Sequence, residues 1–284
     1  MLSPAEFTTA LRGAWQRFNE ELGWARSSHV ALFMMMALFP FCVFVLSMAV
    51  QLSAGIDKEE VIDLVFRAWP DEIAEPIVKE VLAVLEQSSA RTVLIGALLA
   101  MYFASNGVDA VRLAITHAYR EDDPRPWWKT RLLALVFVFL GTIILCFAGL
   151  VSVGVPLYFR FVSDTAPDLY STFLTSEALR TAFGLGALMF AVYAAHAWLP
   201  GRKHRLKTIL PGVVLTIVLW VAAGAVFGSY LRSFGDYSVT YAGLAGIMAA
   251  LVYMYLMSVI FVFSAEVNGQ IMRMRQQASV RKAT

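Results

Sequence analysis

The sequence predicts an all-α, polytopic membrane protein: a bundle of six transmembrane helices with an amphipathic helical hairpin on its outer side. Of its 284 residues, 59% are hydrophobic and only 15% are charged. A soluble domain has about 45–50% apolar and about 25% charged residues, and one hydrophobic core cannot absorb the excess. The apolar residues also lie in long uncharged stretches, whereas a transmembrane β-barrel shows short alternating segments. Helices are therefore the expected way to satisfy the backbone in lipid.

Residues 1–28 are predicted to form a cytoplasmic amphipathic helix beside the membrane. Ser3 and Glu6 form a capping box around Pro4. Apolar residues then recur at helical spacing, at Phe7, Leu11, Ala14, Phe18 and Leu22. Two interpretations stay open: the helix lies on the inner leaflet with its tryptophan at the interface, or it packs on the cytoplasmic face of the bundle itself.

Residues 29–270 form the predicted membrane domain. Its six uncharged stretches are long enough to cross a bilayer, which takes about 20 apolar residues; they are 30–52, 92–108, 132–159, 181–199, 208–231 and 237–265. The segment 57–90 is predicted to be the outer hairpin, because acidic residues begin two apolar stripes of helical spacing. Residues 271–284 are predicted to be a basic cytoplasmic tail.

The placement of Lys and Arg predicts the orientation. Sixteen of the 23 lie in residues 1–29, 109–131, 200–207 and 266–284, which alternate with the segments on the other side of the six spans. Positively charged loops face the cytoplasm. Both termini are therefore expected inside the cell.

Polar residues gather where the second span leaves the membrane and where the last span ends. We predict that these residues meet in an inward-facing polar pocket. They are Ser105, Asn106, Asp109, Arg112, Glu266 and Asn268. Charged groups at membrane depth usually face protein or water because exposure to lipid is costly. The pocket is interpreted either as a site for a substrate, a lipid headgroup or a proton-linked gate, or as a structural belt of ion pairs.

Other features of the spans have both a functional and a packing interpretation. Pro40 interrupts the first span and is a candidate hinge. Gly224 and Gly228 permit close helix contact, within the chain or in a homo-oligomer. The turn between spans four and five is a candidate contact for anionic lipid, or simply a topology signal, through Arg202, Lys203, Arg205 and Lys207.

No constellation that supports catalysis is apparent, so we expect the protein not to be an enzyme. The four histidines are scattered, and the two cysteines, Cys42 and Cys146, lie singly in apolar runs. Neither a metal site, a nucleotide-binding loop nor a nucleophile with its base can be assembled from the sequence. We expect no cofactor, no metal and no nucleic-acid partner.

Several short segments, taken in order, resemble the bacterial YihY/BrkB family, once labelled ribonuclease BN-like. They lie at residues 37–40 (ALFP), 102–107 (YFASNG), 125–128 (RPWW), 210–212 (LPG) and 265–268 (AEVN). The resemblance implies a six-span protein of the bacterial inner membrane with virulence-associated members. It implies no settled biochemical activity.

The expected function is transport or translocation of a lipid or small solute through an inward-facing polar cavity. The alternative is a non-transporting envelope-maintenance or virulence-associated scaffold that binds anionic lipid or protein partners. Both readings name membrane lipids as partners, especially anionic lipids of the inner leaflet. Nuclease activity is not expected.

Overall fold

The computed structural model describes residues 4–52, 90–120, 122–143, 177–202, 204, 206–233 and 244–283, and six single positions between 74 and 83. All regular secondary structure in these residues is helical, which confirms the all-α prediction for this part of the chain. The elements are α1 (Pro4–Glu20), α2 (Gly23–Leu52), α5 (Ala90–Tyr119), a helix over residues 127–143, α8 (Glu177–Trp198), α9 (Leu206–Ser233) and α11 (Leu244–Ala283).

Among the described residues, three helices are long and apolar enough to cross a bilayer. They run over Leu94–Tyr119, Leu206–Leu231 and Gly246–Val280, and Gly184–Trp198 is a shorter apolar helix. Only 28% of the most apolar window of each long helix is buried inside the molecule. The apolar surface that remains faces outward, as expected of helices surrounded by lipid.

The remaining predicted spans fall on helices as well. Residues 30–52 and 181–199 lie in or at the end of α2 and α8, and residues 132–159 begin in the helix 127–143 and extend beyond the described residues. The count of six spans therefore stays a prediction. The predicted outer hairpin 57–90 also lies outside the described residues, apart from α5's first residue and six helical positions.

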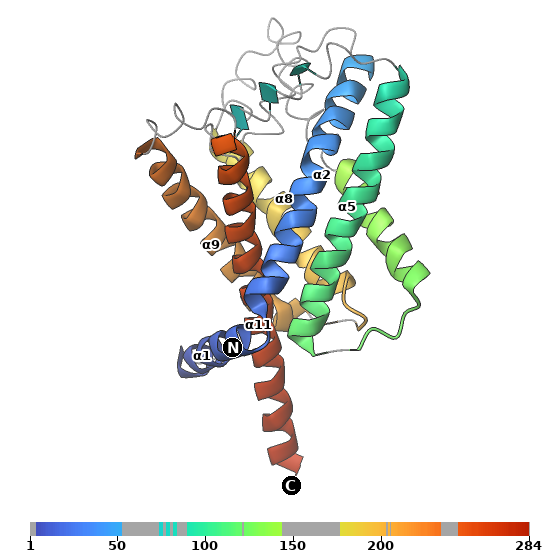
Figure 1. Ribbon diagram of the computed structural model, residues 1–284. Coiled ribbons are helices and arrows are strands. Elements are labelled where there is room, and N and C mark those ends of the chain that lie inside the picture. Colours follow the sequence, from blue (N-terminus) through green and yellow to red (C-terminus); the bar gives the residue numbers. More distant parts are fainter. Residues whose placement is uncertain are drawn as a thin grey trace, which may run out of the picture.

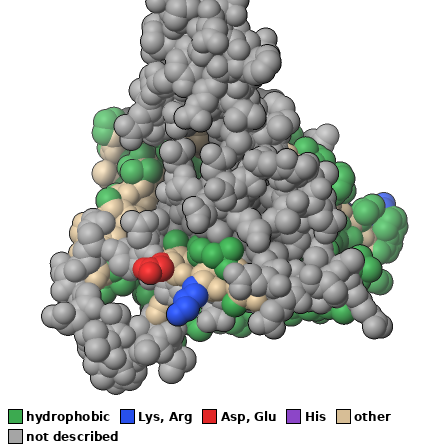
Figure 2. Space-filling model, turned by 90° about the horizontal axis from the view of Figure 1, so that it is seen from above, with side chains coloured by type: hydrophobic (Ala, Val, Ile, Leu, Met, Phe, Trp, Pro, Cys, Tyr) green, Lys and Arg blue, Asp and Glu red, His purple; other side chains and the backbone are tan. Residues whose placement is uncertain are grey.

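The helices pack around α11, which contacts α1, α2, α5 and α9. Figure 1 shows α2 and α5 side by side and antiparallel, with α1 lying across the end of the bundle where both termini are found. Seen from the opposite end, the described side chains around the perimeter are mainly hydrophobic (Figure 2). The predicted tail 271–284 is helical through residue 283 and continues α11 beyond the bundle.

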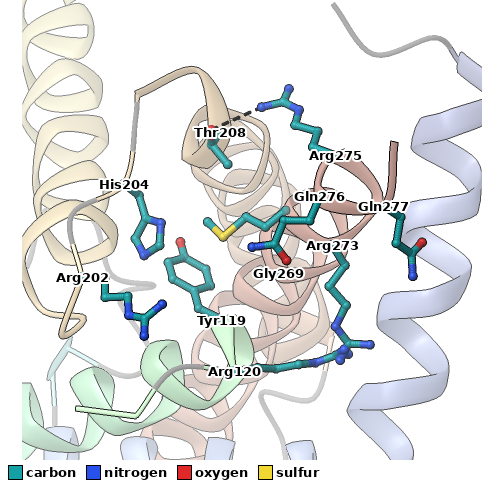
Figure 3. Close-up of a pocket in the computed structure, with 11 residues that line it drawn as sticks. Tyr119, Arg120, Arg202, His204, Thr208, Gly269, Arg273, Arg275, Gln276 and Gln277 are labelled. Atoms are coloured by element: carbon teal, nitrogen blue, oxygen red, sulfur yellow. Dashed lines mark hydrogen bonds between the residues drawn. The ribbon is translucent and has the colours of Figure 1, made fainter. Parts of the chain in front are cut away.

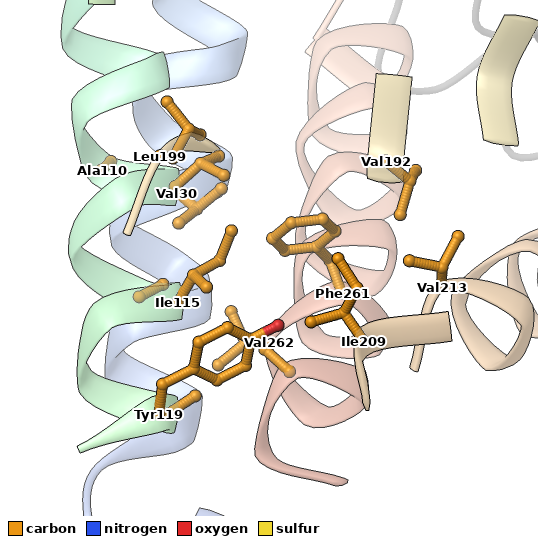
Figure 4. Close-up of a cluster of buried hydrophobic side chains, with 14 of the residues drawn as sticks. Val30, Ala110, Ile115, Tyr119, Val192, Leu199, Ile209, Val213, Phe261 and Val262 are labelled. Carbon is orange, nitrogen blue, oxygen red and sulfur yellow. The ribbon is translucent and has the colours of Figure 1, made fainter. Parts of the chain in front are cut away.

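The main hydrophobic core lies toward the end of the bundle that carries the termini. Ile115 of α5, Ile209 of α9 and Val262 of α11 are completely buried in it, and Figure 4 shows Ile115 and Tyr119 facing α11. Gly269 of α11 lies against the backbone carbonyl of Ala118, where a Cβ atom would overlap it. This close approach fixes the ends of α5 and α11 relative to each other.

Helix α1 packs on the bundle, as the second interpretation of its sequence predicted. Ala10 and Ala14 are buried against Val267 and Ile271 of α11. The small alanines let the helices approach closely, and Gln270 Nε2 donates a 2.9 Å hydrogen bond to the carbonyl of Gly13. Leu22 does not join the buried stripe, because it lies in the turn before α2 with a φ of 57° and is 68% exposed.

Candidate functional site

A cavity of about 840 Å³ opens at the end of the bundle that carries the termini. Its walls are the end of α5, the α8–α9 connection with the start of α9, and the last turns of α11. Figure 3 shows the connection on one side, α11 on the other, and Tyr119 between them. Four arginines line it: Arg120, Arg202, Arg273 and Arg275.

Arg120 reaches the cavity because α5 ends there. Its φ of 57° is left-handed, and its backbone N–H donates a 2.9 Å bond to the carbonyl of His117. Glycine is the usual residue at such a helix end, since a side chain in this conformation costs roughly 1–2 kcal/mol. Arg120 adopts this left-handed conformation despite its energetic cost.

A network of two acids and two arginines braces the cavity wall. Arg112 forms ion pairs with Asp109 at 2.7 Å and with Asp123 at 2.6 Å, and Asp123 also pairs with Arg125 at 2.7 Å. Hydrogen bonds from Arg125, with a further one from Arg112, lower the pKa of Asp123 to about 2. Arg125 donates as well to the carbonyl of Leu199. The network therefore holds the turn that carries Arg202.

Ser105 and Asn106 are engaged elsewhere. The Ser105 hydroxyl donates a 2.8 Å bond to the carbonyl of Tyr102 within its own helix, and Asn106 accepts a bond from Arg131. Neither residue lines the cavity.

Glu266 joins three helices instead of facing the cavity. Its carboxylate, 1% exposed, lies 3.2 Å from Arg17 Nε of α1 and 3.9 Å from Arg26 of α2. The Arg17–Glu266 contact is an ion pair. Arg17 also pairs with Glu21 at 2.8 Å. These contacts tie α1 and α2 to α11.

Asn268 supports the cavity floor from below. Because Pro211 has no N–H, the helical bonding of α9 is interrupted at this point. The fully buried Asn268 accepts a 2.8 Å bond from the N–H of Gly212 and donates a 2.9 Å bond to the carbonyl of Ile209. Its Nδ2 also lies 3.4 Å from the hydroxyl of Tyr119, which lines the cavity.

Tyr119 connects this amide to a buried histidine. Its hydroxyl is 2.6 Å from Nδ1 of His196, which is completely buried. The ring of His204 lies edge-on to the Tyr119 ring at 4.8 Å. Three helices and the α8–α9 connection thus meet at the floor of the cavity.

The predicted site residues are therefore engaged in separate polar contacts around one end of the bundle and are not gathered in a single pocket. Of the predicted lipid contacts, Arg202 lines the cavity, and the carbonyl of Lys207 accepts a 3.5 Å bond from Arg275. Lys203 and Arg205 lie outside the described residues. Pro40 lies inside α2, and its role as a hinge stays a prediction.

The sequence prediction missed Arg273 and Arg275 as site residues. A signal was present, since no Asp or Glu follows Glu266 along the chain, and neither arginine has an acidic residue three or four positions away on its helix. Among the described residues, no group of three His, Cys, Asp or Glu side chains could hold a metal ion.

Long apolar helices and a basic cavity at one end of the bundle define the class: a helical membrane protein with a polar site at the bundle end. The sequence profile of the family described as Virulence factor BrkB matches residues 14–284. The chain belongs to this family.

Two relatives are similar over much of their length. A protein of Bacillus subtilis, YfkH, whose name calls it ribonuclease-like, is 26% identical over 263 residues, which is 91% of this chain and 94% of the relative. A UPF0761 membrane protein of Tolumonas auensis is 24% identical over 186 residues, which is 63% of this chain and 58% of the relative. No solved structure matches the chain.

Proposed function

We propose that this BrkB-family protein moves a lipid or a small solute across the bacterial inner membrane and is not an enzyme. The observation that carries the proposal is the cavity of about 840 Å³ at the end of the bundle. Ligand sites in proteins occupy roughly 300–1,000 Å³, so a lipid headgroup or a small solute fits. The positive-inside rule puts this end in the cytoplasm, where the cavity is the entrance for the cargo.

Two observations support a conducting role over a purely structural one. The charged residues of the second and last spans are paired outside the cavity, Arg112 with Asp109 and Asp123 and Glu266 with Arg17, so that none of them fills it. Pro211 removes one backbone hydrogen bond from the continuous helix α9 behind the cavity floor, and Asn268 bonds to the neighbouring N–H of Gly212 and carbonyl of Ile209. Helices whose backbone bonding is disturbed beside a polar site also occur in transporters.

The test is a flux assay with a cavity-filling variant. Purified protein in liposomes is tested for translocation of fluorescent phospholipids and of labelled small solutes. Met272→Trp places a large ring in the cavity wall, and Met248→Trp is the matched control, because Met248 is on the same helix but 56% exposed. We expect wild type and Met248→Trp to translocate cargo and Met272→Trp to lose most of this activity.

Two results would contradict the proposal. No flux of any cargo in the wild type would remove the transport role. Equal flux in Met272→Trp and wild type would show that cargo does not pass through the cavity.

A scaffold function is the second candidate, and exposed side chains at the α1–α2 corner favour it. Trp15, Leu22 and Trp24 are 52%, 68% and 43% exposed, and exposed apolar patches often mark interaction surfaces. In this case deleting residues 1–20 abolishes the cellular function while the membrane bundle still folds. Full function of the truncated protein would exclude a scaffold that works through α1.

A further inference from the structure

We infer that the cavity binds a phosphate-bearing anion, held by Arg120, Arg202, Arg273 and Arg275. The inference deepens the proposed function and rests on it for the cavity's role as the cargo entrance. It names the chemical class of the ligand, which the proposed function leaves open.

The first observation is how the described arginines divide. Arg17, Arg26, Arg112 and Arg125 each form an ion pair with a carboxylate. The four arginines of the cavity have no carboxylate within ion-pair distance among the described residues. Among the described residues, the arginines around the cavity walls are thus paired with carboxylates and those that line the cavity are not, although Glu21 acts on Arg273 from beyond ion-pair distance.

The four arginines also come from separate parts of the chain. Arg120 ends α5, Arg202 lies in the α8–α9 connection, and Arg273 and Arg275 belong to α11 (Figure 3). A topology signal requires only that basic residues lie on one side of the membrane. It does not require three elements to bring them to one cavity, where their charges repel one another. An anionic ligand would remove this repulsion.

The guanidinium groups keep hydrogen-bond donors for such a ligand. Arg275 makes two long contacts, 3.3 Å to Thr208 Oγ1 and 3.5 Å to the carbonyl of Lys207. The buried Nε of Arg120 has no hydrogen-bond partner among the described residues. Each guanidinium carries five donors in a planar fork that fits phosphate oxygens two at a time.

Phosphate suits this arrangement better than a carboxylate. A carboxylate offers two oxygens, which one arginine can satisfy alone. A phosphate group offers more oxygens in a tetrahedral array, so that arginines on different walls can each bind it. The side chains of Gln276 and Thr208 also line the cavity and can bind the remaining polar groups of a headgroup.

The experiment measures binding of two phosphate sources to the full-length protein. In one arm the protein is placed in nanodiscs with phosphatidic acid or with phosphatidylcholine only, and retained lipid is measured by native mass spectrometry. In the other arm inorganic phosphate is titrated into the detergent-solubilised protein by calorimetry. Thermal unfolding and gel filtration check that each variant folds.

The variants are Arg273→Gln, Arg275→Gln and the matched control Arg12→Gln, which removes an exposed charge of α1 outside the cavity. We expect each cavity variant to bind about tenfold more weakly or worse, because charge-assisted hydrogen bonds to phosphate are lost. The control should bind as wild type does. Arg273→Lys keeps the charge but loses the fork, and we expect an intermediate affinity.

Each outcome decides the inference. Loss of phosphatidic acid binding in the cavity variants supports a lipid headgroup, and loss of inorganic phosphate binding alone supports a soluble phosphate compound. Equal loss in Arg12→Gln and the cavity variants would overturn the site, because it would show only a general effect of charge. No binding of either probe would overturn it as well.

The flux assay distinguishes failure of the proposed transport role from failure of the proposed phosphate site. Phosphate binding without flux removes the transport role and keeps the site. Flux that is unchanged in Arg273→Gln and Arg275→Gln but blocked in Met272→Trp removes the phosphate site and keeps the transport role.

Discussion

Asp123 is the central residue of the ion-pair network beside the cavity wall. It pairs with both Arg112 and Arg125, and its side chain is only 10% exposed. Asp109 and Arg112 are three positions apart on one helix face, a spacing at which opposite charges can pair, and they lie 2.7 Å apart in the structure. The part played by Asp123 was not predictable, because it depends on how the chain turns after α5 ends.

The lowered pKa of Asp123 makes stability depend on pH. Its pKa falls from an ordinary value of 3.8 to about 2, chiefly through its hydrogen bond from Arg125. A carboxyl group with a lowered pKa stabilises the fold fully above its unfolded value. We therefore expect this contribution to be complete above pH 4 and to be lost as the pH falls from about 4 to about 2.

The measurement is the thermal unfolding midpoint in detergent as a function of pH. Asp123→Asn should be less stable than wild type at pH 7 and should lose less stability between about pH 4 and pH 2. Asp122→Asn, at the exposed neighbouring position, is the control and should follow wild type. A wild-type pH profile in Asp123→Asn would contradict the assignment.

At the scale of elements, α1 shows what the periodicity of apolar residues can predict and what it cannot. The apolar stripe predicted a helix with one apolar face, and the structure confirms a helix over Pro4–Glu20. The stripe alone could not distinguish whether that face contacts lipid or protein. Small residues at the contact, Ala10 and Ala14, and the partner Glu266 on α11 decide for protein.

We expect Arg17→Gln to loosen α1 from the bundle. The change removes the nearer ion partner of the buried Glu266 and leaves only Arg26, at 3.9 Å. A buried polar group that loses its partner costs about 1–3 kcal/mol, so hydrogen exchange in residues 4–20 should become faster. Arg12→Gln on the exposed face of α1 should leave the exchange unchanged. Equal protection in both variants would show that Arg17 does not hold the helix.

At the scale of the whole molecule, the distribution of charge predicts the orientation in the membrane. The structure places both termini, the basic cavity and the α8–α9 connection at one end of the bundle (Figure 1). The predicted outer hairpin, at residues 57–90, is expected at the other end.

Reporter tags test this orientation. We expect a tag at residue 204 to be cytoplasmic and one at residue 80 to lie on the opposite side, because 16 of the 23 basic residues lie in the segments assigned to the inner face. A tag at the N-terminus should be found with the tag at 204. Tags at 80 and 204 on the same side would refute the proposed topology.

The sequence by itself determined that this is an all-helical membrane protein, where its long apolar helices lie and which end carries the basic residues. These properties follow from composition, helix periodicity and the cost of placing charge in lipid, which act locally along the chain. Only the tertiary structure decided which charges are partners and which face a cavity. Arg17 with Glu266, and Arg120 with Arg202 and Arg273, are far apart in sequence. They meet only because α11 packs closely against α1, α5 and α9.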